Sequence, residues 1–279
     1  MDVNNKVRIN DLNEILLIPI DKLTCLQHLT FGTHFNQLLS NSLDKLTLLQ
    51  KLTFGDDFNQ PLYNSLDKLT LLQKLTFGYY FNQPLSNSLV KLTSLQYLTL
   101  YYNFNQQLDL PSNIKYLVLD CNNQSIIDNL HNNIEELTLG YNFNLELNNL
   151  PSSIKKIKIY NNNYDKELNN LPSNIKYLVL NCNNQNIIDN LHNNIEEFTL
   201  DYDFNLELDN LPSSIKKIII KNRYYNKELN NLPSSVEYIG LPFNYEKKIL
   251  NIPKNLKEIN CNKNYKFIND FSNCKVSFY

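Results

Sequence analysis

The side chains best suited to metal binding or nucleophilic catalysis in this chain of 279 residues are its four histidines and five cysteines. Cys121 and His131 could in principle act as a nucleophile and its base, and His28 with His34 could hold a metal ion. No Cys, Asp or Glu ligand shares the spacing of the two histidines, and Cys121 and His131 are expected on different faces of the fold. The sequence also lacks a Gly-rich phosphate loop, G-x-S-x-G and HExxH. We therefore predict no catalytic residue, no metal site, no cofactor and no enzyme activity.

The elements that would position any functional side chain come from a short repeat. The pattern apolar-x-x-apolar-x-apolar recurs twelve times, in steps of 23 residues at first and of 19 to 21 residues afterwards. Its first positions are Leu26, Leu49, Leu72, Leu95, Ile114, Ile134, Ile154, Ile175, Ile195, Ile215, Val236 and Leu256. Residues 110–170 and 171–231 are near copies, which indicates that a block of three repeats was duplicated.

Each apolar-x-apolar core predicts a short strand whose alternate side chains point to one side. One unit cannot bury its apolar face alone, whereas parallel stacking of neighbouring units buries a continuous ladder. The prediction is a β-rich solenoid, a leucine-rich-repeat-like right-handed coil of about 12 units. A parallel β-sheet is expected on its concave face and 3₁₀ or extended segments on its convex face. From Leu110 onward the returns read Leu-Pro-Ser-Ser/Asn-Ile, and proline favours extended or polyproline-II backbone there.

A Phe-Asn pair follows the strand core in several units and keeps phase with the apolar pattern. The pairs are Phe35-Asn36, Phe58-Asn59, Phe81-Asn82, Phe104-Asn105, Phe143-Asn144 and Phe204-Asn205. Later units carry tyrosine at the aromatic position (Tyr164, Tyr225, Tyr245 and Tyr265), and no copy reads Phe-Asn-Ile-Pro in full. The two patterns together resemble the FNIP repeat, a leucine-rich-repeat variant, over roughly residues 22–270. The aromatic is lost in the units at Asn123 and Asn184.

FNIP proteins are common in social amoebae and in the giant viruses that infect them. Viral members often carry an F-box, which docks onto a ubiquitin ligase, ahead of the repeats. The segment Asn10–Ile20 is too short for an F-box, so the resemblance carries that docking role onto no residue here. We expect residues 1–22 to form an N-terminal cap, 23–270 the solenoid (23-residue units to about 109, 20–21-residue units after), and 271–279 a closing strand.

Charge and composition set the expected compartment and partner class. The net charge is −2 with mixed signs, so no basic patch supports nucleic-acid binding. No signal peptide and no apolar run long enough for a membrane span is visible, and the five cysteines are an odd, sparse set expected to be free thiols. A cytoplasmic protein is expected (host cytoplasm if virus-encoded), with a protein partner of unknown identity, no nucleic acid and no membrane; the oligomeric state stays open.

Strand side chains that do not enter the core should line the concave face. One exposed column is expected to contain His28, Lys51, Lys74, Tyr97, Tyr116, Glu136, Lys156, Tyr177, Glu197, Lys217, Tyr238 and Glu258, with Tyr101 as a further candidate contact. A second contains Thr30, Thr53, Thr76, Thr99, Val118, Thr138, Lys158, Val179, Thr199, Ile219, Gly240 and Asn260. The first column is basic at its N-terminal end and carries spaced tyrosines, which are favoured at interfaces.

The asparagines are interpreted as structural. Either of two sets could form a buried ladder that satisfies backbone groups. One set lies three residues past the strand (Asn103, Asn122, Asn142, Asn162, Asn183, Asn244 and Asn264), and the other is the Asn of the Phe-Asn pairs. Asn148 and Asn149 suit a turn, because asparagine tolerates left-handed backbone.

The leading functional hypothesis is a non-catalytic scaffold that binds a protein partner through the concave face. It could serve as the substrate-recognition part of a ubiquitin-ligase-type assembly. A structural or self-assembling, particle-associated protein and a carbohydrate-binding module are the alternatives.

Overall fold

The computed structural model describes residues 6–9, 20–85 and 88–279. The chain divides into two compact units, unit 1 from Met1 to Phe143 and unit 2 from Asn144 to Tyr279. Each unit is a solenoid of short parallel strands joined by returns with little regular structure. No helix in the described ranges is both long and apolar enough to span a membrane.

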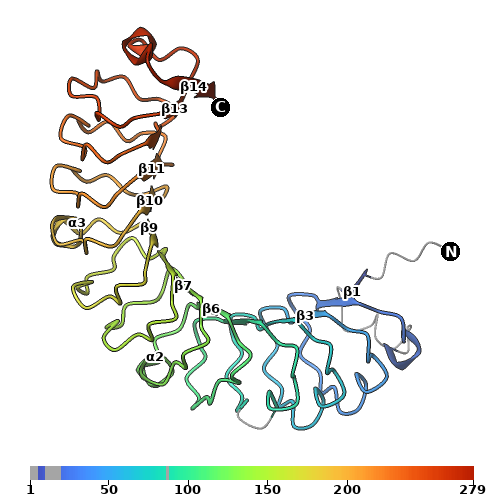
Figure 1. Ribbon diagram of the computed structural model, residues 1–279. Helices are drawn as coiled ribbons and strands as arrows, with labels where there is room; N and C mark the ends of the chain where they lie inside the picture. The colour runs from blue at the N-terminus through green and yellow to red at the C-terminus, as the bar shows by residue number, and fades with distance from the viewer. Residues whose placement is uncertain (1–5, 10–19, 86–87) are drawn as a thin grey trace. The chain divides into compact units, whose positions relative to one another are not determined.

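The described residues of unit 1 form seven strands that follow one another in sequence order (Figure 1). They are β1 (Lys6–Ile9), β2 (His28–Phe31), β3 (Lys51–Thr53), β4 (Lys74–Thr76), β5 (Tyr97–Leu100), β6 (Tyr116–Leu119) and β7 (Glu136–Leu139). Each strand pairs in parallel with the next, from β1·β2 to β6·β7. A 3₁₀ helix η1 (Ile20–Lys22) and a one-turn helix α2 (Gln124–Asp128) complete the unit.

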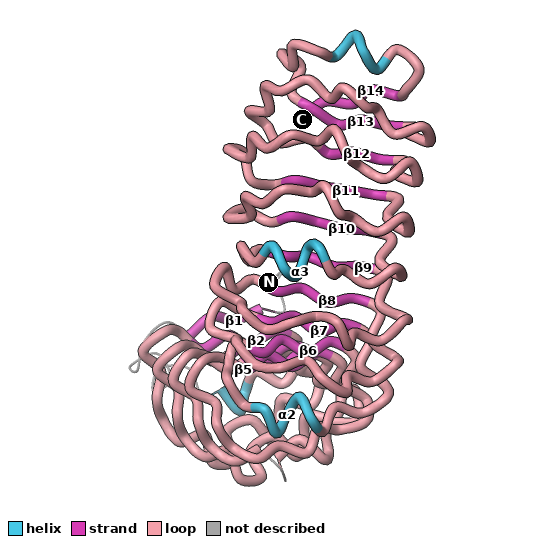
Figure 2. Tube along the Cα trace, turned by 90° about the vertical axis from the view of Figure 1, so that its left-hand side faces the viewer, coloured by secondary structure: helices cyan, strands magenta, loops and turns pink. Residues whose placement is uncertain are grey.

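Unit 2 repeats the arrangement, and Figure 2 shows its strands as successive parallel rungs. They are β8 (Lys156–Ile159), β9 (Tyr177–Leu180), β10 (Glu197–Leu200), β11 (Lys217–Ile220), β12 (Tyr238–Gly240), β13 (Glu258–Cys261) and β14 (Lys275–Phe278). All pair in parallel with their sequence neighbours. Helices α3 (Gln185–Asp189) and η2 (Ile268–Phe271) lie in its returns.

The twelve apolar cores found in the sequence form strands β2–β13, which confirms the repeat register. Strand β1 was not expected. Its Val7 pairs in Cα register with Leu29 and its Ile9 with Phe31, so it continues the parallel sheet by one strand. Of the segment expected to cap the N-terminus, residues 1–5 and 10–19 lie outside the described part of the chain.

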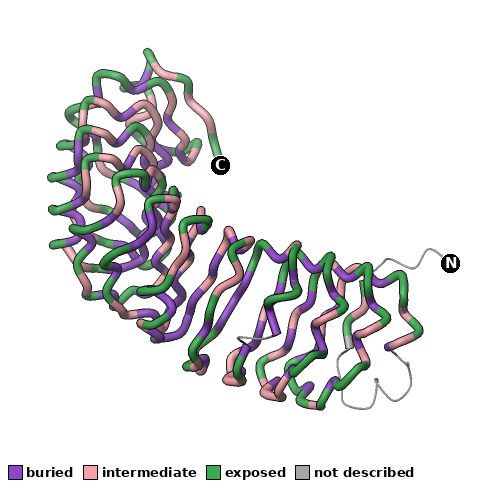
Figure 3. Tube along the Cα trace, turned by 60° about the horizontal axis from the view of Figure 1, so that its bottom comes forward, coloured by how far each residue is buried: buried purple, intermediate pink, exposed green. Residues whose placement is uncertain are grey.

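The core of each unit is the buried ladder of the repeat, and Figure 3 shows buried residues recurring in successive turns. Leu52, Leu75 and Leu98 are 0% exposed in unit 1, and Ile157, Ile218 and Ile239 are 0% exposed in unit 2. Burying such a side chain stabilises a fold by about 1.5–3 kcal/mol, and only the neighbouring turns can bury it. The fold is therefore stabilised by the stacking of many repeats, none of which can bury its apolar face alone.

Unit 1 adds two interlocked stacks of phenylalanine rings to this ladder. Phe31, Phe54 and Phe77 lie at the ends of strands β2, β3 and β4, and their rings stack with 5.3 Å between neighbouring centroids. The motif rings Phe35, Phe58, Phe81 and Phe104 stack at 5.9 to 6.2 Å, and the two stacks meet at 3.9 to 4.1 Å within each turn. The aromatic of the Phe-Asn pair is therefore a core residue.

The returns are built from turns. In the proline-containing returns, the backbone N–H of the isoleucine that ends the Leu-Pro-Ser-Ser/Asn-Ile motif donates to the carbonyl of the proline. Examples are Ile154 N to Pro151 O at 3.2 Å and Ile175 N to Pro172 O at 3.1 Å. This closed turn interrupts the extended backbone expected there. In the two units without an aromatic, the buried Ile126 and Ile127 of α2 and Ile187 and Ile188 of α3 supply the apolar packing.

Two backbone positions need particular residues. A Cβ on Gly55 would lie 2.0 Å from the carbonyl oxygen of Gly32, and one on Gly78 would lie 2.1 Å from that of Gly55. Successive turns therefore approach too closely at these points for any other residue. Asn149 has φ of 61°, which confirms the left-handed turn expected there.

Candidate partner-binding face

The strand register places the first predicted column side by side within each unit. In unit 1, Cα pairing aligns Lys6, His28, Lys51, Lys74, Tyr97, Tyr116 and Glu136. In unit 2 it aligns Lys156, Tyr177, Glu197, Lys217, Tyr238, Glu258 and Lys275. We call these rows the unit 1 column and the unit 2 column. Lys6 and Lys275 are members that the repeat pattern missed, because their strands lie outside its twelve copies.

The column side chains point away from the core. Each begins its strand, and in strands β2–β13 the following residue is buried, as in the exposed-buried alternation of Lys51 and Leu52. Tyr97 is 40% exposed and Tyr177 is 41% exposed. The rings of Tyr97 and Tyr116 stack at 4.2 Å with 9° between their planes, and burial together with Tyr116 raises the pKa of the Tyr97 hydroxyl. The result is a double-ring aromatic surface on adjacent strands.

The two columns differ in how their charges are balanced. In unit 2, Lys217 lies 3.3 Å from Glu197 and 5.5 Å from the ring centre of Tyr238, and Lys275 lies 3.1 Å from Glu258. In unit 1, none of the ion pairs found among the described residues involves Lys6, Lys51 or Lys74. Burial, with Lys51 and Lys6 nearby, lowers the pKa of the His28 imidazole.

The residue immediately before each strand shows the same contrast. It is glutamine in four turns of unit 1, at positions 27, 50, 73 and 96. In unit 2 it is charged and paired: Glu196 contacts Lys176 at 3.3 Å and Lys216 at 2.8 Å, which lowers the pKa of the Glu196 carboxyl. Unit 2 therefore neutralises its own surface charge, whereas strands β1–β6 of unit 1 carry no acidic residue.

The second predicted column is only partly accessible. Thr30, Thr53 and Thr76 are half-buried, but Thr99 is 7% exposed and Val179 is 9% exposed, and Gly240 is also buried. The expectation of a fully exposed row is wrong at these positions.

Tyr101, the further candidate contact, does not belong to the column. It follows β5, is 36% exposed, and its carbonyl accepts the N–H of Phe104 at 3.0 Å. Burial first, and then Asp120 and Asp56, raise the pKa of its hydroxyl. It lies at the strand-end edge of unit 1.

The Phe-Asn pairs divide into buried rings and surface amides. Phe35, Phe58, Phe81, Phe104, Phe143 and Phe204 are all 0–1% exposed. The Oδ1 atoms of Asn36, Asn59 and Asn82 each accept the backbone N–H of the next motif asparagine, including that of Asn105, at 2.9 Å. In unit 2, Asn144 Oδ1 accepts from Asp165 N at 3.2 Å, and Asn205 N donates to Asn183 Oδ1 at 2.9 Å. The ladder exists, but these amides are half-buried or exposed.

The buried polar row lies at a position that neither asparagine set contained. Asn161, Asn181 and Asn222, with the carboxylates of Asp120 and Asp201, are 2–8% exposed and follow the strand ends. Asn222 shows their role: its Nδ2 donates to Phe204 O at 2.9 Å and its Oδ1 accepts from Tyr224 N. The expectation that one of the two predicted sets forms the buried ladder is wrong. The signal available in the sequence was a polar residue three positions before the motif aromatic in some units, such as Asn161 before Tyr164 and Asn222 before Tyr225.

The tyrosines that replace phenylalanine keep the ring in the core and bond their hydroxyl to the preceding turn. Tyr164, Tyr245 and Tyr265 donate to backbone carbonyls at 3.1, 3.0 and 2.8 Å. Tyr225 is the exception, because its buried hydroxyl has no hydrogen-bond partner within the described residues. These units retain the architecture of the phenylalanine units.

Two of the cysteines and two of the histidines are held inside the packing or in hydrogen bonds between neighbouring residues. Cys121 is 1% exposed and burial raises the pKa of its thiol to about 12, while burial raises that of Cys182 to about 11. A ring nitrogen of His131 lies 2.9 Å from Pro111 O, and a ring nitrogen of His192 lies 2.8 Å from Asn194 Nδ2. Across the described part of the chain, no group of three or more His, Cys, Asp or Glu is placed to hold a metal.

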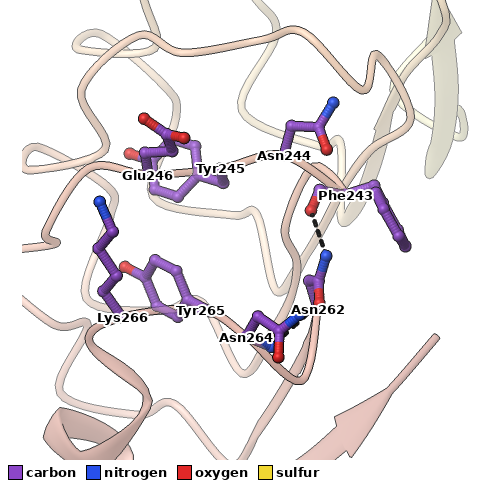
Figure 4. Close-up of a pocket in the computed structure, with 8 residues that line it drawn as sticks. All are labelled: Phe243, Asn244, Tyr245, Glu246, Asn262, Asn264, Tyr265 and Lys266. Carbon is purple, nitrogen blue, oxygen red and sulfur yellow. Dashed lines mark hydrogen bonds between the residues drawn. The ribbon is translucent and has the colours of Figure 1, made fainter.

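A small hollow between the turns that follow β12 and β13 is lined by Phe243, Asn244, Tyr245, Glu246, Asn262, Asn264, Tyr265 and Lys266 (Figure 4). Asn262 Nδ2 donates to Phe243 O across it at 3.0 Å. This bond belongs to the same inter-turn packing as that of Asn222. The hollow is therefore explained by the repeat itself.

Comparisons with known proteins agree with this architecture. The FNIP repeat family matches residues 104–142, 122–162, 141–183 and 202–244. No curated protein matches the chain in sequence. Among solved structures, CroV588, described as a novel circular LRR protein, is 27% identical with a TM-score of 0.62; the match covers 87% of this chain and 37% of that one.

Two more distant structures show the fold alone. The LRR protein LIC12759 of Leptospira interrogans is 18% identical with a TM-score of 0.50, covering 93% of this chain and 74% of that one. A chain of the Toll–Spätzle complex of Drosophila is 13% identical with a TM-score of 0.51, covering 96% of this chain and 44% of that one. The chain is a solenoid of the leucine-rich-repeat type and carries FNIP repeats.

Proposed function

We propose that this protein is a non-catalytic scaffold that binds a protein partner through the outward-facing columns of its strand sheet. The observation that carries the proposal is the row of aligned, solvent-accessible side chains in each unit, with tyrosines at positions 97, 116 and 177. Tyrosine offers a large contact area and a hydroxyl at small entropic cost, which is why interfaces are enriched in it. Seven strands spaced by about 4.8 Å extend over about 29 Å, a length suited to a protein interface.

The test is affinity capture with a triple variant, Tyr97→Ala, Tyr116→Ala and Tyr177→Ala. A matched control replaces three exposed tyrosines away from the columns, Tyr63, Tyr202 and Tyr224, by alanine. We expect the column variant to lose its partner in quantitative mass spectrometry and the control to keep it. Undiminished capture by the column variant would contradict the proposal.

A carbohydrate ligand is a second candidate, favoured by the exposed ring surface of Tyr97 and Tyr116. A glycan array distinguishes it from a protein partner, because sugar binding should then depend on the same two rings. Self-assembly is the third, and a monodisperse monomer in light scattering would rule it out.

We also place the protein in the cytoplasm. The support is chemical: all five cysteines are free thiols, three of them buried. A role as the substrate-recognition part of a ubiquitin-ligase assembly would use the same columns. Co-purification of ligase subunits with both the wild-type chain and the triple variant, with loss of the substrate protein in the triple variant alone, would support that role.

A further inference from the structure

We propose that the unit 1 column binds an acidic segment of a partner protein, with the stacked Tyr97–Tyr116 rings receiving an apolar side chain next to the acidic residues. This inference rests on the proposed function and names the chemistry of the partner.

The first step is the unbalanced charge of the face. Lys6, His28, Lys51 and Lys74 occupy four consecutive strands in register, and Lys51 and Lys74 are exposed. No ion pair found in the described ranges engages these lysines, and their strands contain no acidic residue. Lys51 and Lys74 lie opposite each other on paired strands, and like charges in that arrangement destabilise a sheet, so a bound anion would stabilise it.

The second step is the comparison with unit 2, which has the same repeat and the same strand register. There the corresponding positions alternate in sign and pair with each other, as Glu197 with Lys217 and Glu258 with Lys275. The basic row of unit 1 is therefore not a requirement of the fold. The column of unit 1 differs from that of unit 2 in its charges, and its lysines, unpaired within the described residues, are available to bind an acidic partner.

The third step is the kind of anion. Unit 1 as a whole has nine basic and thirteen acidic residues, so its field repels an extended polyanion. The strand-end edge carries Asp56 and Asp57 beside a hollow whose lining includes Arg8 as well as Thr53, Thr76 and Tyr101. A nucleic-acid backbone would meet these carboxylates, whereas a narrow peptide lying over the column would not. The observations therefore favour a protein segment.

The fourth step is geometry. From Lys6 to Lys74 the column crosses three strand intervals, about 14 Å. An extended peptide places alternate side chains about 6.6 Å apart, so acidic residues at three alternating positions span about 13 Å and match the row. The rings of Tyr97 and Tyr116 occupy the next two strands, where an apolar side chain following the acidic residues would lie.

The experiment uses the full chain and a fluorescent peptide of about eight residues, with three alternating glutamates followed by leucine. We expect saturable binding that weakens with added salt and falls at least about tenfold in the double variant Lys51→Glu, Lys74→Glu. The matched control is Lys22→Glu, Lys68→Glu, which makes the same charge change in unit 1 at exposed positions off the face. It should bind like the wild type, and the glutamine version of the peptide should not bind.

Three results overturn the inference: no binding of the acidic peptide to the wild-type chain, equal loss in both double variants, or tighter binding of a single-stranded oligonucleotide at the same lysines. Failure of the proposed function is a separate outcome. If Lys51→Glu, Lys74→Glu keeps the native partner while the tyrosine triple variant loses it, the scaffold role stands and only the acidic chemistry is wrong.

Discussion

Truncating one ring in the aromatic stack of unit 1 should cost a large part of the stability of that unit. The variant is Phe58→Ala. The Phe58 side chain is 0% exposed, and its ring lies 4.1 Å from that of Phe54, 5.9 Å from that of Phe35 and 6.0 Å from that of Phe81. Removing a fully buried phenylalanine costs about 3–5 kcal/mol, and the three ring contacts place this site at the upper end.

That loss is large compared with the total stability of a folded domain, about 5–15 kcal/mol. The free energy of unfolding is measured by urea titration with far-UV circular dichroism, and hydrogen exchange of the β3 and β4 amides locates the loss. Because each turn contacts only its neighbours, exchange in unit 2 should change little. Phe58→Leu, which keeps most of the buried volume, should cost about 1 kcal/mol.

The matched control is Phe243→Ala. Phe243 is 52% exposed and its nearest ring partner, Tyr279, is 6.4 Å away, so the loss should stay below about 1 kcal/mol. The packing argument is refuted if Phe58→Ala costs less than about 1 kcal/mol or if both alanine variants lose the same amount.

Three further predictions each concern one chemical group: the absent Cβ of a glycine, a tyrosine hydroxyl and a cysteine thiol. Gly55→Ala should destabilise the chain by about 1–3 kcal/mol because its Cβ would meet a neighbouring carbonyl oxygen at 2.0 Å, whereas Gly240→Ala, with nearest atoms at 3.5 Å, should be tolerated; thermal melts of the two compare them. Tyr225→Phe should leave the free energy of unfolding unchanged or raise it, since the buried hydroxyl has no hydrogen-bond partner in the described ranges. Tyr245→Phe removes a hydrogen bond and should lower the free energy of unfolding by about 1 kcal/mol. A larger loss of stability for Tyr225→Phe than for Tyr245→Phe in urea titrations would contradict this. Burial raises the pKa of the Cys121 thiol to about 12, so iodoacetamide at pH 8 should not modify this thiol until the chain is unfolded. The stability that the protonated thiol contributes should be lost as the pH rises from about 9 towards 12. Rapid modification of the folded chain would show instead that the thiol is accessible.

The strand ladder could be predicted from sequence because hydrophobic periodicity is a local signal. Leu52, Leu75 and Leu98 recur at a fixed step and end in adjacent parallel strands. The column of Lys51, Lys74 and neighbours followed from the same register, since a strand alternates its side chains.

The polar ladders could not be assigned in the same way. Asn161 and Asn222 lie two residues past the ends of their strands, whereas Asp120, Asn181 and Asp201 lie one residue past theirs. The Nδ2 of Asn222 bonds to Phe204 O in a neighbouring turn, and sequence spacing does not show such a contact. Strand β1 was missed because its short Lys-Val-Arg-Ile segment lacks the motif that marks the other turns. The contrast in charge balance needed the side-chain contacts: only the structure pairs Lys217 with Glu197.

The most direct test of the scaffold function is site-specific photo-crosslinking in the cell that makes the protein. A photoreactive phenylalanine is placed at Lys51 or Tyr177, on the columns, and at the exposed Leu71, on a return segment. We predict that a defined partner protein is crosslinked from the column positions and not from Leu71. Crosslinking of that partner from Leu71 alone, or none from either column, would contradict the account.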